Sequence, residues 1–230
     1  MSAMKTLNYS RIPRKTAATA GVLYLLTFVS VPTISLYKAL HQPDYGLNSS
    51  SDTPAIIGGL LEIIVALGCI GSAITLYPLL KKQNESLALA LVASRVLEAG
   101  TIFIGVAFIL AAVGLHQQGA EPAAQVIIRM LVTLYDRVFL LGQSFMPAVN
   151  DALLGYLLYQ SRLVPRAIPV IGIMGVLPLL AGYLAIMFGH ISRDSAWAGL
   201  SAVLVALFEL TLGIYLTVKG FSNRSEEVYS

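Results

Sequence analysis

The sequence predicts an all-α integral membrane protein, a six-transmembrane-helix bundle with both termini on the cytoplasmic side. Three observations predict this fold class. Of the 230 residues, 57% are hydrophobic and only 12% are charged, about half the usual charged share. Six segments are apolar for about 20 residues, the length that crosses a hydrocarbon core ~30 Å thick. Basic residues gather in alternate connections between these segments, as the positive-inside rule requires.

The composition excludes several other classes of protein. It is too apolar for a disordered chain, a coiled coil or a collagen-like fibre. The net charge of +3 is small and no Lys/Arg face is present, so nucleic acid is excluded as a partner. The one cysteine, Cys69, allows neither an internal disulfide nor a cysteine-based zinc site, and we interpret it as a small packing residue. Phosphate-loop, zinc-protease and serine-hydrolase motifs are absent, and no cofactor is expected.

The polar connections are short, so residues 1–230 are expected to form a single membrane domain. The first span is expected to be retained, because its apolar run of about twenty residues is longer than the core of a signal peptide. The second span contains Gly58, Gly59, Gly68 and Gly71, which let a neighbouring helix approach closely. The predicted spans are residues 17–37, 55–80, 87–115, 138–159, 167–188 and 196–218.

The segment before the fourth span needs a separate explanation, since a helix that absorbed it would be too long to cross the bilayer. Residues 123–135 alternate apolar side chains with Arg129 and Thr133 at helical spacing. This pattern predicts an outer interfacial helix over residues 123–137 that bends into the fourth span.

The basic residues determine the predicted orientation. With a cytoplasmic N-terminus, the outer loops hold Lys38 and Arg193, while Arg129 and Arg137 lie before or at the outer end of the fourth span. The bias toward the inside predicts that both termini are cytoplasmic. The basic residues of the inner segments are Lys5, Arg11, Arg14, Lys15, Lys81, Lys82, Arg162, Arg166, Lys219 and Arg224.

Polar residues inside three spans fall at one depth. Ionisable groups within a membrane are costly and face the bundle interior or a wet cavity. At 1.5 Å per residue, Arg95, Asp151 and Glu209 each lie ~12–13 Å from the inner boundary. Glu98 is one turn deeper than Arg95 and can pair with it at i, i+3. The candidate ligand- or proton-binding residues are therefore Arg95, Glu98, Asn150, Asp151 and Glu209.

The fourth span has a polar face, because Asp136, Gln143 and Asn150 recur every seven residues beside Pro147 and Asp151. The charges of the candidate residues do not balance. One arginine stands against three carboxylates, so the fully ionised group would carry a net charge of −2. Some carboxylates therefore carry a proton, or a cation is bound.

Two further sets of residues are weaker candidates. Glu62 and Arg137 lie at the same outer level and are expected to form a polar pair, with a structural role preferred. His41, His116 and His190 each fall on a different external loop. They are weak candidates for an outer metal site, and the preferred interpretation is ordinary solvated histidines with no metal bound.

Several motifs resemble an uncharacterised bacterial six-helix membrane family, domain of unknown function 4386. Residues 76–82 (LYPLLKK) and 93–98 (ASRVLE) resemble its second and third helices, and residues 155–166 (GYLLYQSRLVPR) resemble the exit of its fourth. Residues 208–210 (FEL), residues 216–221 (LTVKGF), Arg14 and residues 21–24 resemble its last and first helices. The resemblance implies six helices, a retained first span and a bacterial inner-membrane location, but it implies no reaction.

Three functions remain open. The first is binding or transport of a small cation, a proton or a small molecule. In it Arg95 would organise the carboxylates, Glu98 and Asp151 would contact the ligand, and Glu209 would exchange a proton. The second is a non-catalytic membrane partner or sensor, in which the polar cluster is structural. The third is an intramembrane lipid-modifying enzyme with the carboxylates as acid and base. The expected surroundings are the lipid bilayer, and protein partners remain unknown.

Overall fold

The computed structural model describes residues 13–47, 50–119 and 122–222, and these residues form helices and connections without a β-strand. Lys5, Arg11 and Arg224, which enter the orientation argument, lie outside the described residues. The elements are α1 (Arg14–Leu26), the 3₁₀ turn η1 (Thr27–Ser30), α2 (Thr33–Leu36), the 3₁₀ turn η2 (Tyr45–Leu47), α3 (Thr53–Leu80), α4 (Glu85–Gln117), α5 (Pro122–Phe139), the π-helical segment η3 (Leu140–Phe145), α6 (Met146–Ser161), α7 (Ala167–Met187) and α8 (Ala196–Val218).

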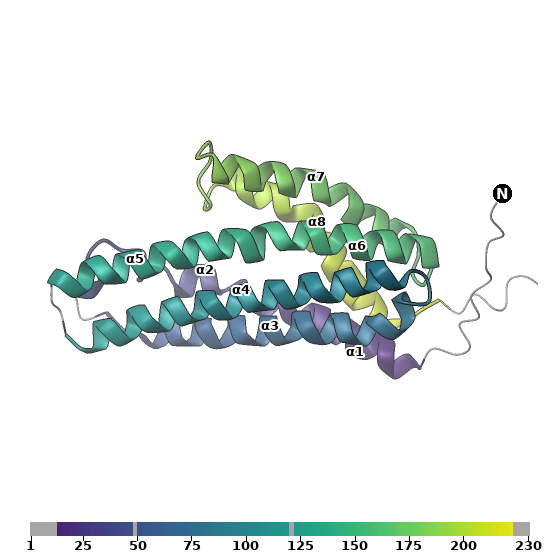
Figure 1. Ribbon diagram of the computed structural model, residues 1–230, viewed down its shortest axis with the longest axis horizontal. Helices are drawn as coiled ribbons and strands as arrows, with labels where there is room; N and C mark the ends of the chain where they lie inside the picture. The colour runs from purple at the N-terminus through teal and green to yellow at the C-terminus, as the bar shows by residue number, and fades with distance from the viewer. Residues whose placement is uncertain (1–12, 48–49, 120–121, 223–230) are drawn as a thin grey trace, which may run out of the picture.

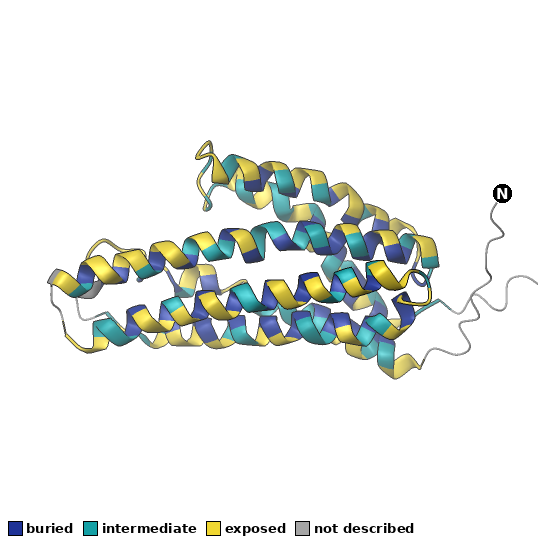
Figure 2. Ribbon diagram, viewed as in Figure 1, coloured by how far each residue is buried: buried dark blue, intermediate teal, exposed yellow. Residues whose placement is uncertain are grey.

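Five helices in the described part of the chain are long and apolar enough to cross a membrane. They are the composite first helix Arg14–Leu36 and the helices α3, α4, α7 and α8. Their outward faces carry large apolar side chains, such as Leu177 at 74% exposure and Ile34 at 72%. Figure 2 shows exposed positions along the outside of the bundle and buried positions along its inside. An apolar exterior of this extent fits a multi-pass membrane protein.

Six of the described helices pack side by side in a closed ring. α1 contacts α3 and α8, α3 contacts α4, α4 contacts α6, α6 contacts α7, and α7 contacts α8. In Figure 1, α3, α4 and the long rod of α5 and α6 run side by side, while α7 and α8 are shorter and inclined to them. Polar side chains on α1, α3, α4, α6 and α8 can therefore meet inside the ring.

The first span is a helix with an interruption, because α1 is followed by the turn η1 and then by α2. Pro32 precedes α2 and cannot donate a backbone hydrogen bond. Hydroxyl groups also bond back to the chain here: Thr27 donates to the Tyr24 carbonyl at 2.7 Å and Ser30 to the Thr27 carbonyl at 3.2 Å. These local bonds compete with the helical ladder and tighten it into 3₁₀ geometry.

The helix expected over residues 123–137 is present as α5, but the bend expected near residue 137 is not. α5 passes through η3 into α6, and Figure 1 shows one gently curved path. α5 packs along α4, so it follows the bundle axis instead of lying across it. Its amphipathic pattern is satisfied by burying one face against α4. An interfacial helix has the same pattern, so the sequence alone does not distinguish the two.

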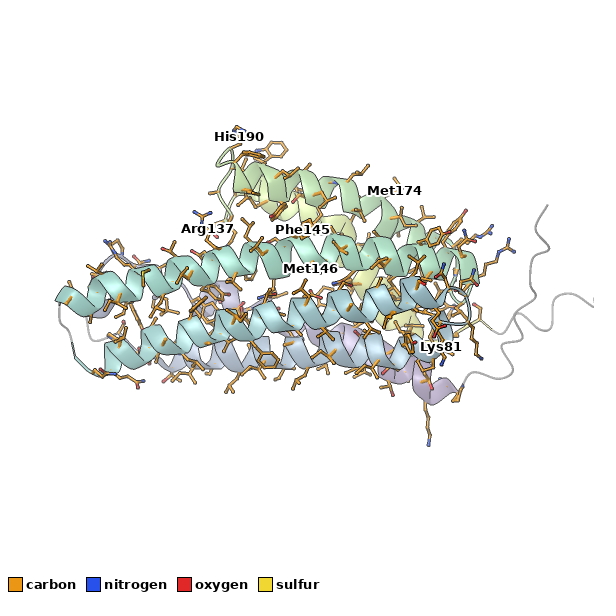
Figure 3. The ribbon with its side chains drawn as sticks, viewed as in Figure 1. Lys81, Arg137, Phe145, Met146, Met174 and His190 are labelled. Atoms are coloured by element: carbon orange, nitrogen blue, oxygen red, sulfur yellow. The ribbon has the colours of Figure 1, made fainter. Side chains whose placement is uncertain are left out.

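The basic residues of the predicted inner segments gather at one end of the bundle. This end, hereafter the basic end, carries Arg14, Lys15, Lys81, Lys82, Arg162, Arg166 and Lys219. Figure 3 places Lys81 there, and it places Arg137 and His190 toward the opposite end.

Candidate functional site

Arg95 lies at the centre of the ring with 2% of its surface exposed. Its Nη1 atom donates to Glu98 Oε2 at 3.0 Å, and its Nη2 atom donates to Glu209 Oε1 at 2.9 Å. Nη2 also donates to the Tyr24 hydroxyl at 3.1 Å, and the guanidinium stands over the Tyr24 ring. Nη1 lies 3.6 Å from the Cys69 sulfur. One guanidinium thus connects α1, α3, α4 and α8.

A second chain of bonds connects α4 to α6. Asn150 donates from Nδ2 to Glu98 Oε2 at 2.7 Å and accepts from the Ser94 hydroxyl at 2.6 Å. Glu98 Oε2 therefore receives one donor from Arg95 and one from Asn150, which stabilises its ionised form. Glu98 lies next to both Ser94 and Arg95 on the surface of α4, because it follows Ser94 by four residues and Arg95 by three.

Asp151 lies beside this network without joining it. It is 0% exposed, and neither carboxylate oxygen accepts a hydrogen bond from any described residue. The charges of Glu209, Arg95 and Glu98 are near enough to act on it. An ionised carboxylate in this position would be unpaired and would cost several kcal/mol.

We call these eight residues the Arg95 cluster: Tyr24, Cys69, Ser94, Arg95, Glu98, Asn150, Asp151 and Glu209. The structure brings together all five candidate ligand- or proton-binding residues of the sequence analysis. Sequence reasoning missed Ser94 and Tyr24 and assigned Cys69 to packing. The i, i+4 spacing of Ser94 and Glu98 could have identified Ser94, whereas nothing in the surroundings of Tyr24 marks it.

The π-helical segment helps to position Asn150 and Asp151 on α6. Pro147 has no N–H for the Gln143 carbonyl, and its ring would clash with that carbonyl in a regular α-helix. The wider turns of η3 precede this proline. Gly142, inside η3, brings α4 close, because a Cβ there would collide with the Thr101 side chain. Single π turns inside α-helices are frequent at functional sites.

Glu62 does not pair with Arg137, so the expectation of an outer polar pair is wrong. Among the described residues, Glu62 Oε1 accepts from the Tyr135 hydroxyl at 2.6 Å and from Gln143 Nε2 at 3.5 Å. Its other oxygen, Oε2, has no hydrogen-bond partner within the described part of the chain. Arg137 follows buried Tyr135 by two residues, which is about 200° around the helix, so it points away from Glu62 and is exposed.

The three histidines have separate partners. His41 pairs with Asp136 at 3.1 Å, and His116 pairs with Asp52 at 2.7 Å and stacks on Tyr45. His190 is exposed, with its ring near Phe188. Within the described part of the chain, no three His, Cys, Asp or Glu residues gather closely enough to hold a metal ion.

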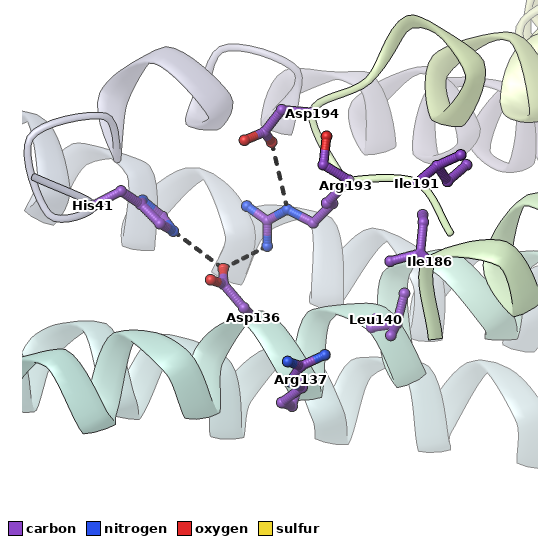
Figure 4. A pocket seen from close by; sticks show the side chains of 9 residues that line it. His41, Asp136, Arg137, Leu140, Ile186, Ile191, Arg193 and Asp194 are labelled. Atoms are coloured by element: carbon purple, nitrogen blue, oxygen red, sulfur yellow. Dashed lines mark hydrogen bonds and ion pairs between the residues drawn. The ribbon is translucent and has the colours of Figure 1, made fainter. Parts of the chain in front are cut away.

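A pocket of about 240 Å³ lies on the side of the bundle away from the basic end, and Figure 4 shows its lining side chains. Asp136 accepts from Arg193 Nη1 at 2.6 Å and binds His41 Nε2 at 3.1 Å. The heptad-spaced residues of the fourth span thus belong to three different sites. Asp136 lines this pocket, Gln143 binds Glu62, and Asn150 belongs to the Arg95 cluster. We call this cavity the outer pocket; its lining consists of His41, Asp136, Arg137, Leu140, Ile186, Ile191, Ser192, Arg193 and Asp194.

A family model described as Domain of unknown function (DUF4386) matches residues 19–220. The matched range includes every residue of the Arg95 cluster and of the outer pocket. No curated protein and no solved structure matches the chain.

Proposed function

Because the chain belongs to the DUF4386 family, which is described as a domain of unknown function, we propose a function from the geometry of the buried cluster. The protein binds a proton or a small cation at Asp151 and exchanges it as part of transport across the membrane. The observation that carries this proposal is the fully buried carboxylate of Asp151, whose two oxygens have no hydrogen-bond partner among the described residues.

The distribution of hydrogen-bond donors supports Asp151 as the binding residue. Arg95 donates to Glu98 and to Glu209, and Glu98 receives a second donor from Asn150. Each of these two carboxylates therefore has a cation beside it, and in their charged forms the two carboxylates and Arg95 sum to a net charge of −1. A negative charge on Asp151 would be repelled by this net negative charge in a region of low dielectric constant. A proton or a cation on Asp151 therefore lowers the free energy of the cluster.

Exchange with the surroundings takes place through Glu209 in this proposal. The side chain of Glu209 is 13% exposed, compared with 6% for Glu98 and 2% for Arg95. Its carboxylate is also near enough to Asp151 for the two charges to repel each other. A proton that leaves Asp151 thus has a carboxylate acceptor that is itself partly open.

The proposal includes a topology of six spans, in which η3 and α6 form the sixth span beside the five apolar helices. α6 alone has 16 residues, and with the six residues of η3 it reaches 22, or about 33 Å, enough to cross the bilayer core. The basic end then faces the cytoplasm. The family resemblance supports the inner membrane of a bacterium as the location.

Infrared spectroscopy of the protein in lipid vesicles tests the proposal, because the C=O stretch of a protonated carboxyl group is distinct from that of a carboxylate. We expect a carboxyl band that Asp151→Asn removes and Asp194→Asn keeps, since Asp194 is an exposed carboxylate at the other end. Proton or cation flux into the same vesicles should also be lost in Asp151→Asn. A carboxyl band and a flux that both survive Asp151→Asn would refute the proposal.

A structural role of the cluster is the second candidate, and the bonds from Ser94 to Asn150 to Glu98 and on to Arg95 favour it. These bonds connect helices that are distant in the sequence. In this case Asp151→Asn leaves function unchanged, whereas Asn150→Ala lowers stability by about 1–3 kcal/mol, because it leaves Ser94 and Glu98 with one partner fewer. Gln160→Ala, an exposed position on the same helix, is the matched control.

A further inference from the structure

The outer pocket combines cationic side chains with an aliphatic wall. Arg137, Arg193 and His41 supply the cations, and Leu140, Ile186 and Ile191 supply the wall. Figure 4 shows that these side chains come from three separated parts of the chain: the segment after α2, the α5–η3 rod, and the end of α7 with the connection that follows it. This site lies away from the Arg95 cluster and has no part in the function proposed for it.

The hydrogen bonds of His41 require a charged imidazolium. Its Nδ1 atom faces the Tyr37 carbonyl at 2.9 Å, and its Nε2 atom faces Asp136 Oδ1 at 3.1 Å. Both partners accept hydrogen bonds, and a neutral imidazole has only one N–H to donate. His41 therefore satisfies both partners only when it carries a positive charge.

The acidic side chains of the pocket leave one cation unmatched. Asp136 is shared between His41 and Arg193. Asp194 is 83% exposed and lies 3.9 Å from Arg193, a distance at which water screens the attraction. Arg137 makes no ion pair with an acidic residue of the described chain. With His41 charged, three positive groups face two negative ones, and the net charge of the lining is +1.

The pocket lies at the level of a lipid head group. α7 has 21 residues and is about 31 Å long, close to the ~30 Å of the hydrocarbon core. The connection that follows α7 and carries Ile191 and Arg193 is therefore at the membrane surface. Arg137 is 24 residues from Ser161 along the α5–η3–α6 rod, or about 36 Å, which gives the same level.

We propose that the outer pocket binds a phosphate group, with Arg137 as its principal ligand and Arg193 as a second, pre-oriented cation. A guanidinium matches phosphate oxygens with its planar fork of donors. Arg193 is held in place by Asp136 and by stacking over Phe139 at 4.6 Å. The aliphatic residues beside the cations can contact the glycerol and acyl carbons of a phospholipid, and the same cations can bind free inorganic phosphate.

The protein contains its own probe for the lipid, because the sequence has one tryptophan. Trp197 lies in the first turn of α8, is 71% exposed, and follows Arg193 by four residues. Lipids brominated on their acyl chains quench tryptophan fluorescence only at short range. We expect brominated phosphatidylglycerol to quench Trp197 more than brominated phosphatidylcholine, with a relative affinity of about fivefold, the factor typical of one basic side chain near an anionic lipid.

The variant Arg137→Gln should abolish that preference, whereas Arg129→Gln should keep it. Arg129 is an exposed arginine on the same helix and does not line the pocket. In a second arm, inorganic phosphate is titrated against protein in phosphatidylcholine vesicles, and thermal stabilisation is measured. A response to the lipid alone identifies a phospholipid site, and a response to inorganic phosphate alone identifies a free-phosphate site. Failure of both arms, or an equal loss in Arg129→Gln, would overturn the proposal.

Discussion

Arg95 and Asp151 are both fully buried in one cluster, and they differ in the partners of their charges. The guanidinium of Arg95 donates to two carboxylates and a hydroxyl, and it stands over an aromatic ring. Both oxygens of Asp151 lack a donor among the described residues. Burial alone therefore does not decide which group can exchange a proton. The number of hydrogen-bond partners of each charged group decides it.

His41 gives the residue-scale prediction, because it lies outside the spans and its charge depends on its bond to Asp136. Its hydrogen bond to Asp136 raises the pKa of His41 above its usual value, while burial and the charge of Arg193 act in the opposite direction. The pair therefore stabilises the fold fully below the unfolded-state pKa, and its contribution is lost as the pH rises through the higher folded-state pKa. The melting temperature should fall as the pH rises above about 6.5, the usual pKa of histidine, and less so in His41→Gln.

The matched control for this prediction is His190→Gln, which changes an exposed histidine at the same end of the bundle. It should melt with the pH dependence of the wild type. An identical pH dependence in His41→Gln and the wild type would show that the His41–Asp136 pair does not contribute.

At the scale of elements, the sequence predicted the helices well and their irregularities poorly. The second, third, fifth and sixth predicted spans agree with α3, α4, α7 and α8 within two residues at each end, because long apolar runs are a strong signal. The break at Pro32 and the π turns before Pro147 escaped prediction. Both depend on how the backbone redistributes its bonds around a proline, which hydropathy does not describe.

Helix–helix distances at glycines give the element-scale prediction. A Cβ added at Gly21 of α1 would lie 2.6 Å from the carbonyl oxygen of Gly213 on α8, so Gly21→Ala must push the two helices apart. We expect a loss of about 1–3 kcal/mol in stability, typical of overpacking, measured by unfolding in detergent. Gly100→Ala on α4 is the control, because a Cβ there meets nothing within 4 Å. It should raise stability by up to about 1 kcal/mol, and an equal response of the two variants would contradict the close packing of α1 and α8.

At the scale of the whole molecule, residues expected at one depth came together, whereas Glu62 and Arg137 did not pair. Arg95, Asp151 and Glu209 lie together because their three helices place them at one level of the bundle, and a closed ring leaves only its interior for buried charges. Glu62 and Arg137 also share a level, but they face different directions. The depth of a residue follows from the number of residues to the end of its helix, so the sequence predicts it well. The direction in which a side chain points depends on the rotation of its helix about the helix axis, and the π turns of η3 change that rotation.

The direction of the α5–η3–α6 rod provides the whole-molecule prediction, because the sixth span and the orientation of the bundle both depend on it. In a Cys69→Ala background, single cysteines would replace Ser86, Gln160 and His190, which are all exposed. Ser86 and Gln160 lie beside the connections at the basic end, and His190 lies in the connection after α7. If the rod crosses the bilayer and the basic end is cytoplasmic, a membrane-impermeant maleimide added to intact cells should label only the cysteine at 190. Permeabilisation should then expose those at 86 and 160 together.

Two other labelling patterns would contradict this topology. Labelling at 160 in intact cells, with 86 still protected, would show that the rod does not cross the bilayer. Labelling at 86 and 160, with 190 protected, would show that the bundle has the opposite orientation.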